Sequence, residues 1–185
     1  MTCRSPLGVD LDCHRCPLSR ERTQVVPGSG DTGARLMLVG EAPGAIEDQG
    51  GEPFIGRAGT ILDKALEEAG LSRGRLWIAN TVRCRPPDNR TPRDVEIATC
   101  SFQLDAELEA LRPRVLVALG ATASGALVGR PVALKKEAGS VHNLRRAGMD
   151  LQCVVTYHPA GLIYRPTAFP QLVNDLTLAW ELSQG

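Results

Sequence analysis

The sequence predicts a single α/β domain, residues 1–185, in which a four-stranded, mainly parallel sheet is flanked by helices on both faces. Three observations lead to this class. Short, continuous apolar runs typical of buried strands alternate with segments of helical periodicity. Each apolar run leads into a turn or a helix, which is the pattern of βα units. No repeat or linker interrupts the 185 residues, a length suited to one domain.

The strands are predicted at residues 35–40, 76–82, 114–120 and 153–159. Between them, residues 58–70 place five apolar side chains on one helical face. Thr91 and Pro92 are typical of an N-cap and a first turn, so a long helix is expected from there. A short helix follows residue 120, and the last helix is expected to start near Thr167. Residues 129–150 are the least patterned and indicate a loop or an irregular hairpin.

Charge and hydropathy limit the possible classes of protein. The 21 basic and 21 acidic residues balance, which argues against a global nucleic-acid-binding field but allows a local basic patch. No apolar run is long enough to cross a bilayer, and no signal-peptide pattern begins the chain. We therefore expect a cytoplasmic monomer that does not enter a membrane.

Four of the six cysteines form a set that indicates metal chemistry. Cys13 and Cys16 make a C-x-x-C pair, and Cys84 and Cys100 follow with fifteen residues between them. In a cytosolic chain such a set favours a metal or redox site over disulfides. Four thiolates suit either tetrahedral zinc or a [4Fe–4S] cluster, and the spacing does not decide between them. Cys153, in an apolar run, is expected to be an ordinary buried thiol.

Polar residues follow the predicted strands at the points where ligands bind open parallel sheets. Glu41, Asn80 and His158 each come at or just after a strand end, and Gly120 follows the third strand. The carboxyl ends of the strands form one edge of the sheet, called the rim below. Residues 39–59, VGEAPGAIEDQGGEPFIGRAG, add six glycines and Phe54 to this rim. An acid, an amide and a histidine are therefore expected to share one edge of the sheet.

Three motifs carry a resemblance to a known family. GEAPGAIEDQGGEPFIGRAG, NTVRCRPPDNRTP and TYHPAGL are similar to motifs of the family-four, iron–sulfur uracil-DNA glycosylases, and the four cysteines match that family's cluster spacing. The resemblance extends from Cys13 to the last helix. It implies a DNA repair enzyme that flips uracil out of single- or double-stranded DNA, hydrolyses its N-glycosidic bond and leaves an abasic site.

The resemblance also implies the roles of individual residues. Phe54 would stack on the flipped uracil, Gly40 would let the backbone approach it, and Ala42 is counted among the substrate-binding residues. The Asn80 amide suits the N3–H and O4 groups of uracil and would reject cytosine, which reverses both. His158 would stabilise the leaving uracil anion, and Glu41 the cationic sugar or the attacking water. Glu47 would shape the pocket wall that excludes the methyl group of thymine, whereas Asp48 is expected to be structural.

For the cysteines, the resemblance implies a structural [4Fe–4S] cluster bound by Cys13, Cys16, Cys84 and Cys100. The cluster would tie residues 1–30 to the arginine-rich loop around Cys84. That loop would then present Arg83, Arg85 and Arg90 to DNA phosphates.

Three alternatives stay open. A related subgroup attaches covalently to the abasic site through a histidine, and His142 would be the candidate here, although Ala42 replaces that subgroup's glutamine. A non-catalytic iron–sulfur DNA-binding module would keep the cysteines without needing Asn80 and His158. A nucleotide-binding or hydrolytic α/β enzyme would use the same rim, but the G-x-x-x-x-G-K-[ST] motif of nucleotide-binding enzymes is not in the sequence.

Overall fold

Six strands form one mixed sheet in the order β1-β3-β2-β4-β6-β5. The computed structural model describes residues 3–185. The inner strands β3, β2, β4 and β6 are parallel to one another, whereas β1 and β5 pair antiparallel at the two edges. The strands are β1 Ser29–Gly30, β2 Leu36–Gly40, β3 Trp77–Asn80, β4 Val115–Leu119, β5 Val141–Arg146 and β6 Met149–Thr156.

The predicted α/β class is confirmed, but the predicted strand number is wrong. The four predicted strands correspond to the inner parallel four, because only these have the continuous apolar runs that burial on both faces requires. The edge strand β1 has two residues, Ser29 and Gly30, and no apolar side chain to mark it. In the edge strand β5, the half-buried positions are His142, Leu144 and Arg146. Two of these three side chains are polar, so the strand lacks the alternation of apolar and polar residues that would mark it in the sequence.

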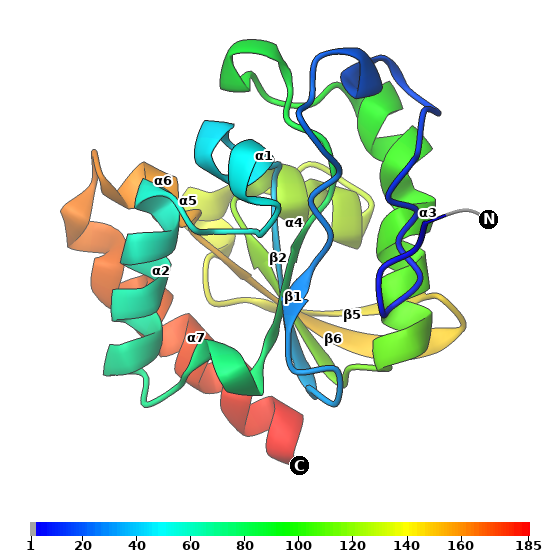
Figure 1. Ribbon diagram of the computed structural model, residues 1–185. Coiled ribbons are helices and arrows are strands. Elements are labelled where there is room, and N and C mark those ends of the chain that lie inside the picture. The colour runs from blue at the N-terminus through cyan, green and yellow to red at the C-terminus, as the bar shows by residue number, and fades with distance from the viewer. Residues whose placement is uncertain (1–2) are drawn as a thin grey trace.

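Helices cover both faces of the sheet, with α2 and α7 on one side and α3 on the other (Figure 1). Leu62 and Leu66 of α2 and Leu172 and Leu176 of α7 belong to one core cluster, and α3 and α4 supply a second. The α-helices are α1 Ala45–Gly50, α2 Arg57–Glu68, α3 Asp94–Leu111, α4 Ala121–Val128, α5 Leu134–Glu137, α6 Pro159–Leu162 and α7 Phe169–Gln184. The 3-10 turns are η1 Pro17–Arg20, η2 Arg73–Arg75, η3 Pro87–Asn89 and η4 Pro166–Ala168.

Two helices begin later than predicted. Helix α3 starts at Asp94 with Arg93 as its N-cap, not at Thr91. The Glu96 carboxylate accepts a hydrogen bond from the Arg93 N–H at 2.7 Å and so caps the helix from within its first turn. Helix α7 starts at Phe169, because the 3-10 turn η4 comes first.

Residues 129–150, predicted as a loop or an irregular hairpin, contain α5 and a regular hairpin of β5 and β6. Arg146 pairs with Met149, which leaves Ala147 and Gly148 as a two-residue turn. Both turn residues have positive φ, 48° and 72°, as a type I′ turn requires. Because alanine rarely takes this conformation, the turn has no clear signal in the sequence.

The N-terminal segment, residues 3–28, lies along α3. The Gln103 side chain bonds both backbone groups of Asp10, at 2.8 and 2.9 Å. The Gly28 N–H donates to Glu107 at 2.7 Å. Val9, Leu18 and Val25 form a third apolar cluster with Cys84 and Cys100. Among residues 3–185, no helix combines the length and the apolar character needed to cross a membrane.

Candidate active site and cysteine cluster

The carboxyl ends of the four parallel strands bring the predicted rim residues together. Gly40 is the last residue of β2 and pairs with Asn80, the last residue of β3. Gly120 follows β4, and its N–H donates to the carbonyl of Thr156, the last residue of β6, at 2.9 Å. His158 comes two residues after that strand end. One edge of the sheet therefore carries Glu41, Asn80 and His158.

Gly40 is the point on which Phe54 and Asn80 converge. A Cβ atom at position 40 would lie 2.4 Å from Cζ of Phe54 and 2.5 Å from Oδ1 of Asn80, so only glycine leaves room for both side chains. The Asn80 side chain is buried, and its Oδ1 has no hydrogen-bond partner in the described part of the chain. A buried acceptor without a partner costs about 1–3 kcal/mol, and a bound ligand with an N–H group would remove that cost.

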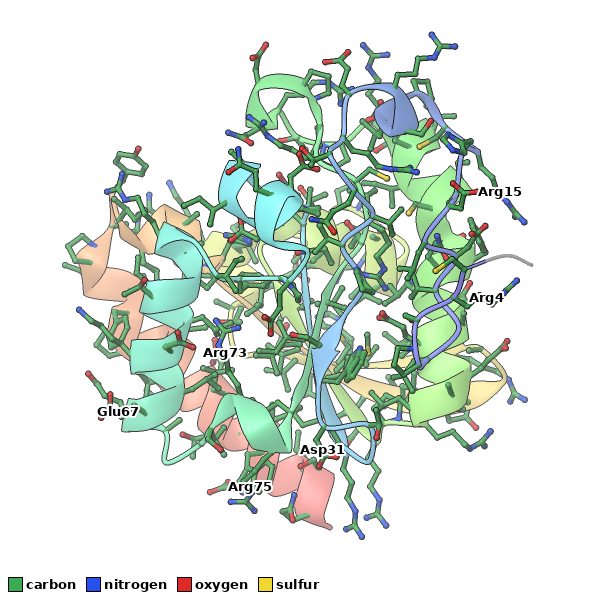
Figure 2. All side chains as sticks on the ribbon, in the orientation of Figure 1. Arg4, Arg15, Asp31, Glu67, Arg73 and Arg75 are labelled. Carbon is green, nitrogen blue, oxygen red and sulfur yellow. The ribbon has the colours of Figure 1, made fainter. Side chains whose placement is uncertain are left out.

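Phe54 is held in an unusual backbone conformation. Its φ is 55°, in the left-handed region that bulky residues seldom adopt. Arg73 donates hydrogen bonds to the carbonyls of Phe54 and, at 3.3 Å, of Pro53. Its Nε donates to Asp63 on α2 at 2.5 Å, and Figure 2 shows Arg73 beside that helix. Backbone and guanidinium together fix the direction of the Phe54 ring, which is buried and 5.6 Å from the His158 ring.

His158 is held as a neutral imidazole. Its Nδ1 accepts a hydrogen bond from the Ala160 N–H at 3.1 Å, which places the single ring proton of the neutral form on Nε2. Burial lowers the pKa of His158 to about 4, although the charge of Glu47 opposes this effect. The His158 Cβ also lies 2.8 Å from where a Cβ of Gly120 would be. The ring is therefore a hydrogen-bond donor at neutral pH, with its position fixed from two sides.

Glu41 is oriented by two threonines from neighbouring elements. The Thr122 hydroxyl, in the first turn of α4, donates to Glu41 Oε2 at 2.5 Å. The Thr81 hydroxyl donates to the Glu41 carbonyl at 2.6 Å. Glu41 directly follows Gly40, and its carboxylate is held at the first turn of α4. Ala42, the next residue, packs against the apolar cluster that contains Cys84.

Glu47 and Asp48 both hold backbone in place. The two Glu47 oxygens accept from the Gly44 N–H at 3.1 Å and the Gly56 N–H at 2.8 Å, so this one carboxylate joins the two ends of the loop that contains Phe54. Asp48 is buried and accepts from the Thr23 N–H, which attaches the N-terminal segment to α1. Glu47 therefore determines the shape of the loop whatever else it contacts.

Cys13, Cys16, Cys84 and Cys100 lie in one region between the N-terminal segment, the loop after β3 and α3. Burial raises the pKa of the Cys84 thiol to about 11, and the charges of Cys100 and Cys16 add to that rise. Burial also raises the pKa of Cys100, with contributions from Cys16 and Cys13. Arg22 opposes the shift at Cys84 by donating to its sulfur at 3.2 Å. Each buried thiol therefore has two others of the set near it.

No group of three or more His, Cys, Asp or Glu side chains within residues 3–185 is arranged to hold a single metal ion. One zinc ion needs four thiolates within about 2.3 Å of one point. In a four-iron cluster each thiolate binds a different iron, so the sulfurs stand farther apart. Four neighbouring thiols are a donor set that the larger group can use.

The arginines near Cys84 differ in exposure. Arg83 is 1% exposed and bonded inside the protein, so it is not available to a phosphate. Arg85 lies at the surface and donates to Asn89 at 2.8 Å. Arg90 is half-buried and forms a bidentate ion pair with the buried Glu96, with hydrogen bonds of 2.7 and 2.8 Å. No local pattern in the sequence indicates the contacts of Arg73 with Phe54 and of Thr122 with Glu41, because they link elements far apart in the chain.

His142, the candidate for covalent attachment, lies along the sheet instead of at its carboxyl edge. It is on β5, paired with Cys153 of β6, five residues before His158. Its Nε2 lies 2.8 Å from the Ser140 hydroxyl and 3.9 Å from the Glu137 carboxylate.

The sequence matches a known protein family and several of its members. Residues 27–181 match the sequence profile described as the uracil DNA glycosylase superfamily. The chain is 39% identical over 171 residues to a type-4 uracil-DNA glycosylase of Pyrobaculum aerophilum, covering 90% of this chain and 87% of the relative. It is 43% identical over 152 residues to the type-4 enzyme of Thermotoga maritima, covering 82% and 78%. A type-5 uracil-DNA glycosylase of Pyrobaculum aerophilum is 39% identical over 186 aligned positions, covering 82% and 80%.

Proposed function

The chain belongs to the uracil-DNA glycosylase superfamily, and from that premise we propose that it removes uracil from DNA by hydrolysing the N-glycosidic bond. The observation that carries the proposal is the buried Asn80 Oδ1, which has no partner among residues 3–185 and lies against Phe54. An unpaired acceptor beside an aromatic ring suits a flat ligand that has an N–H on its edge. Uracil flipped out of a DNA strand is such a ligand.

Recognition rests on two side chains. The Asn80 amide accepts from N3–H of uracil and donates to O4, whereas cytosine presents the reverse pattern and would leave both amide groups mismatched. The Phe54 ring provides a stacking face worth roughly 1–3 kcal/mol per base. This is comparable with the few kcal/mol that unstacking the nucleotide costs.

Bond cleavage places negative charge on uracil and positive charge on the sugar. The neutral His158 ring donates its Nε2–H towards O2 of uracil, where charge develops, without transferring a proton. Glu41, held by Thr122, is a carboxylate next to the base and can stabilise the cationic sugar or orient the attacking water. The products are free uracil and an abasic site.

Cys13, Cys16, Cys84 and Cys100 would hold the [4Fe–4S] cluster that the family resemblance implies. When bound, the cluster supplies a rigid cross-link between the N-terminal segment, the loop after β3 and α3, and hydrolysis requires no electron from it. Arg85 and Arg90 lie in the same loop and are the arginines proposed to contact DNA phosphates. Covalent attachment through His142 gains no support from its position on β5.

The direct test uses a uracil-containing oligonucleotide, single-stranded or paired with guanine, followed by alkaline cleavage at abasic sites. Strand cleavage after incubation with the protein is expected, and none with the cytosine-containing oligonucleotide. His158→Ala and Asn80→Ala should each lower the rate by roughly 100-fold or more, the scale of losing one group that stabilises developing charge. A wild-type protein that leaves uracil in place would remove the proposal.

A further inference from the structure

A buried ion pair contacts the main chain of Asn80, the residue proposed to recognise uracil. The Arg83 and Glu107 side chains are 1% and 0% exposed, with Nη2 of Arg83 2.7 Å from Oε2 of Glu107. The second nitrogen of the same guanidinium, Nη1, donates to the main-chain carbonyl of Asn80. We propose that Arg83, held by Glu107, is a positioning residue that fixes the Asn80 amide for uracil, an inference that rests on the function proposed above.

The pair holds both ends of β3. Glu107 accepts from the indole N–H of Trp77, the first residue of β3, at 3.2 Å. Through Arg83 it also reaches the carbonyl of Asn80, the last residue of that strand. Its other oxygen accepts from the Gly28 N–H at 2.7 Å, which adds the N-terminal segment. Helix α3 therefore anchors the strand that presents Asn80 through a single carboxylate.

Asn80 needs such support because its own side chain has little. Its Oδ1 has no hydrogen-bond partner in residues 3–185. The direction of the amide is therefore set by its backbone and by packing against Phe54 and Gly40. The Asn80 amide projects from the Cα atom next to the carbonyl that Arg83 bonds. Because the guanidinium bonds the carbonyl, it opposes displacement of that Cα and hence of the acceptor that faces N3 of uracil.

Stability alone gives no reason for a buried pair here. Removing two charges from water costs several kcal/mol per ion, and well-packed apolar residues of similar volume are often as stable or more so. Nε of Arg83 is itself buried and unpaired within the described chain, which is a further cost. The hydrogen bonds to the Asn80 carbonyl, the Trp77 indole and the Gly28 N–H are what an apolar pair could not reproduce, and only the first of them bears on the residue proposed to recognise uracil.

The test replaces both charges together. Arg83→Met with Glu107→Leu leaves no unpaired buried charge, but it removes the acceptor of the Trp77 and Gly28 N–H groups, so circular dichroism and thermal unfolding verify that the variant is folded. We expect excision of uracil, as kcat/KM, to fall roughly 10- to 100-fold, the scale of misplacing a catalytic-site group by about 1 Å. Inhibition by free uracil should weaken as well. If this variant fails to fold, Arg83→Gln with Glu107→Gln keeps a neutral polar pair, and the same losses are expected.

The matched control is Arg146→Met with Asp105→Leu. Arg146 also pairs with a carboxylate of α3, at 2.6 Å, and also donates to a main-chain carbonyl, that of Ala126 at 3.4 Å. It lies away from Asn80, so excision and uracil inhibition should stay within about twofold of wild type.

A mutant cycle decides whether Arg83 acts through Asn80. In an Asn80→Ala background, the Arg83→Met/Glu107→Leu change should cause little further loss, because its target is gone. Full additivity would overturn the inference, and so would unchanged excision and unchanged uracil inhibition in a folded double variant. Either result leaves the proposed function standing, whereas a wild-type protein without glycosylase activity would refute the function itself.

Discussion

The Phe54 and His158 rings are in direct contact, with centroids 5.6 Å apart and planes tilted by 32°. This separation lies within the range of aromatic pairs. A base therefore cannot insert between them, and in the proposed function it stacks on Phe54 while meeting His158 at its edge. The residue proposed to stack on uracil and the residue proposed to stabilise its developing charge thus contact each other.

Phe54→Leu should lower kcat/KM for uracil excision by roughly 5- to 150-fold, because the loss of base stacking is worth about 1–3 kcal/mol. Leucine keeps the site apolar, so the protein should remain folded. Phe102→Leu is the control: Phe102 contacts Arg15 on the surface of α3, away from the rim. Equal rates for Phe54→Leu and wild type, measured on single-stranded substrate, would exclude stacking on this ring.

His158 should titrate far below a free histidine, since burial lowers its pKa to about 4. Because the unfolded chain takes up this proton near pH 6.5 and the folded protein only near pH 4, stability should fall as pH drops through that window and then level off. The charge of Glu47 acts in the opposite direction.

An NMR titration of the ring protons measures this shift directly. The three histidines give three signals, and His158→Asn identifies the one that belongs to position 158. A midpoint near 6.5 for that signal would contradict the neutral ring described above, and with it a charge-neutral mechanism at pH 6.

Arg73→Gln should reduce excision by about tenfold, because it removes the charged donor to the Phe54 carbonyl, an interaction worth about 1.5–3 kcal/mol. Arg75→Gln is a control from the same turn, η2. The Arg75 guanidinium lies 4.3 Å from the Trp180 ring and does not contact the Phe54 loop. Equal losses in the two variants would show a general effect of η2 and no specific support of Phe54.

Cys100→Ser should lose bound iron and acid-labile sulfide and unfold at a lower temperature, whereas Cys153→Ser should keep both iron and sulfide. Both thiols are buried, and burial raises the pKa of Cys153 to about 12, but Cys153 lies on β6 away from the other cysteines. Iron and sulfide analysis of anaerobically purified protein measures the difference. Stoichiometric zinc in place of iron would show that the cluster assignment is wrong.

The parts of the molecule that sequence predicts well are those with local patterns. The inner strands were predictable because Leu36–Gly40 and Val115–Leu119 are apolar throughout, and the rim followed from where these strands end. The edge strand β5 could not be recognised, since His142 and Arg146 share its inward side with Leu144. Arg83 was expected to face phosphates, yet it is buried against Glu107, a partner 24 residues away that no local pattern indicates.

The close contact at Gly59 limits how this protein can be stabilised. A Cβ at position 59 would lie 1.8 Å from the Phe54 carbonyl oxygen, so the common glycine-to-alanine exchange would push α2 away from the loop it supports. Gly74 has no heavy atom within 4 Å of its Cβ position and no positive φ, so the same exchange is free of that conflict there. Efforts to raise heat resistance should therefore treat the first turn of α2 as fixed and seek their gains elsewhere on the surface.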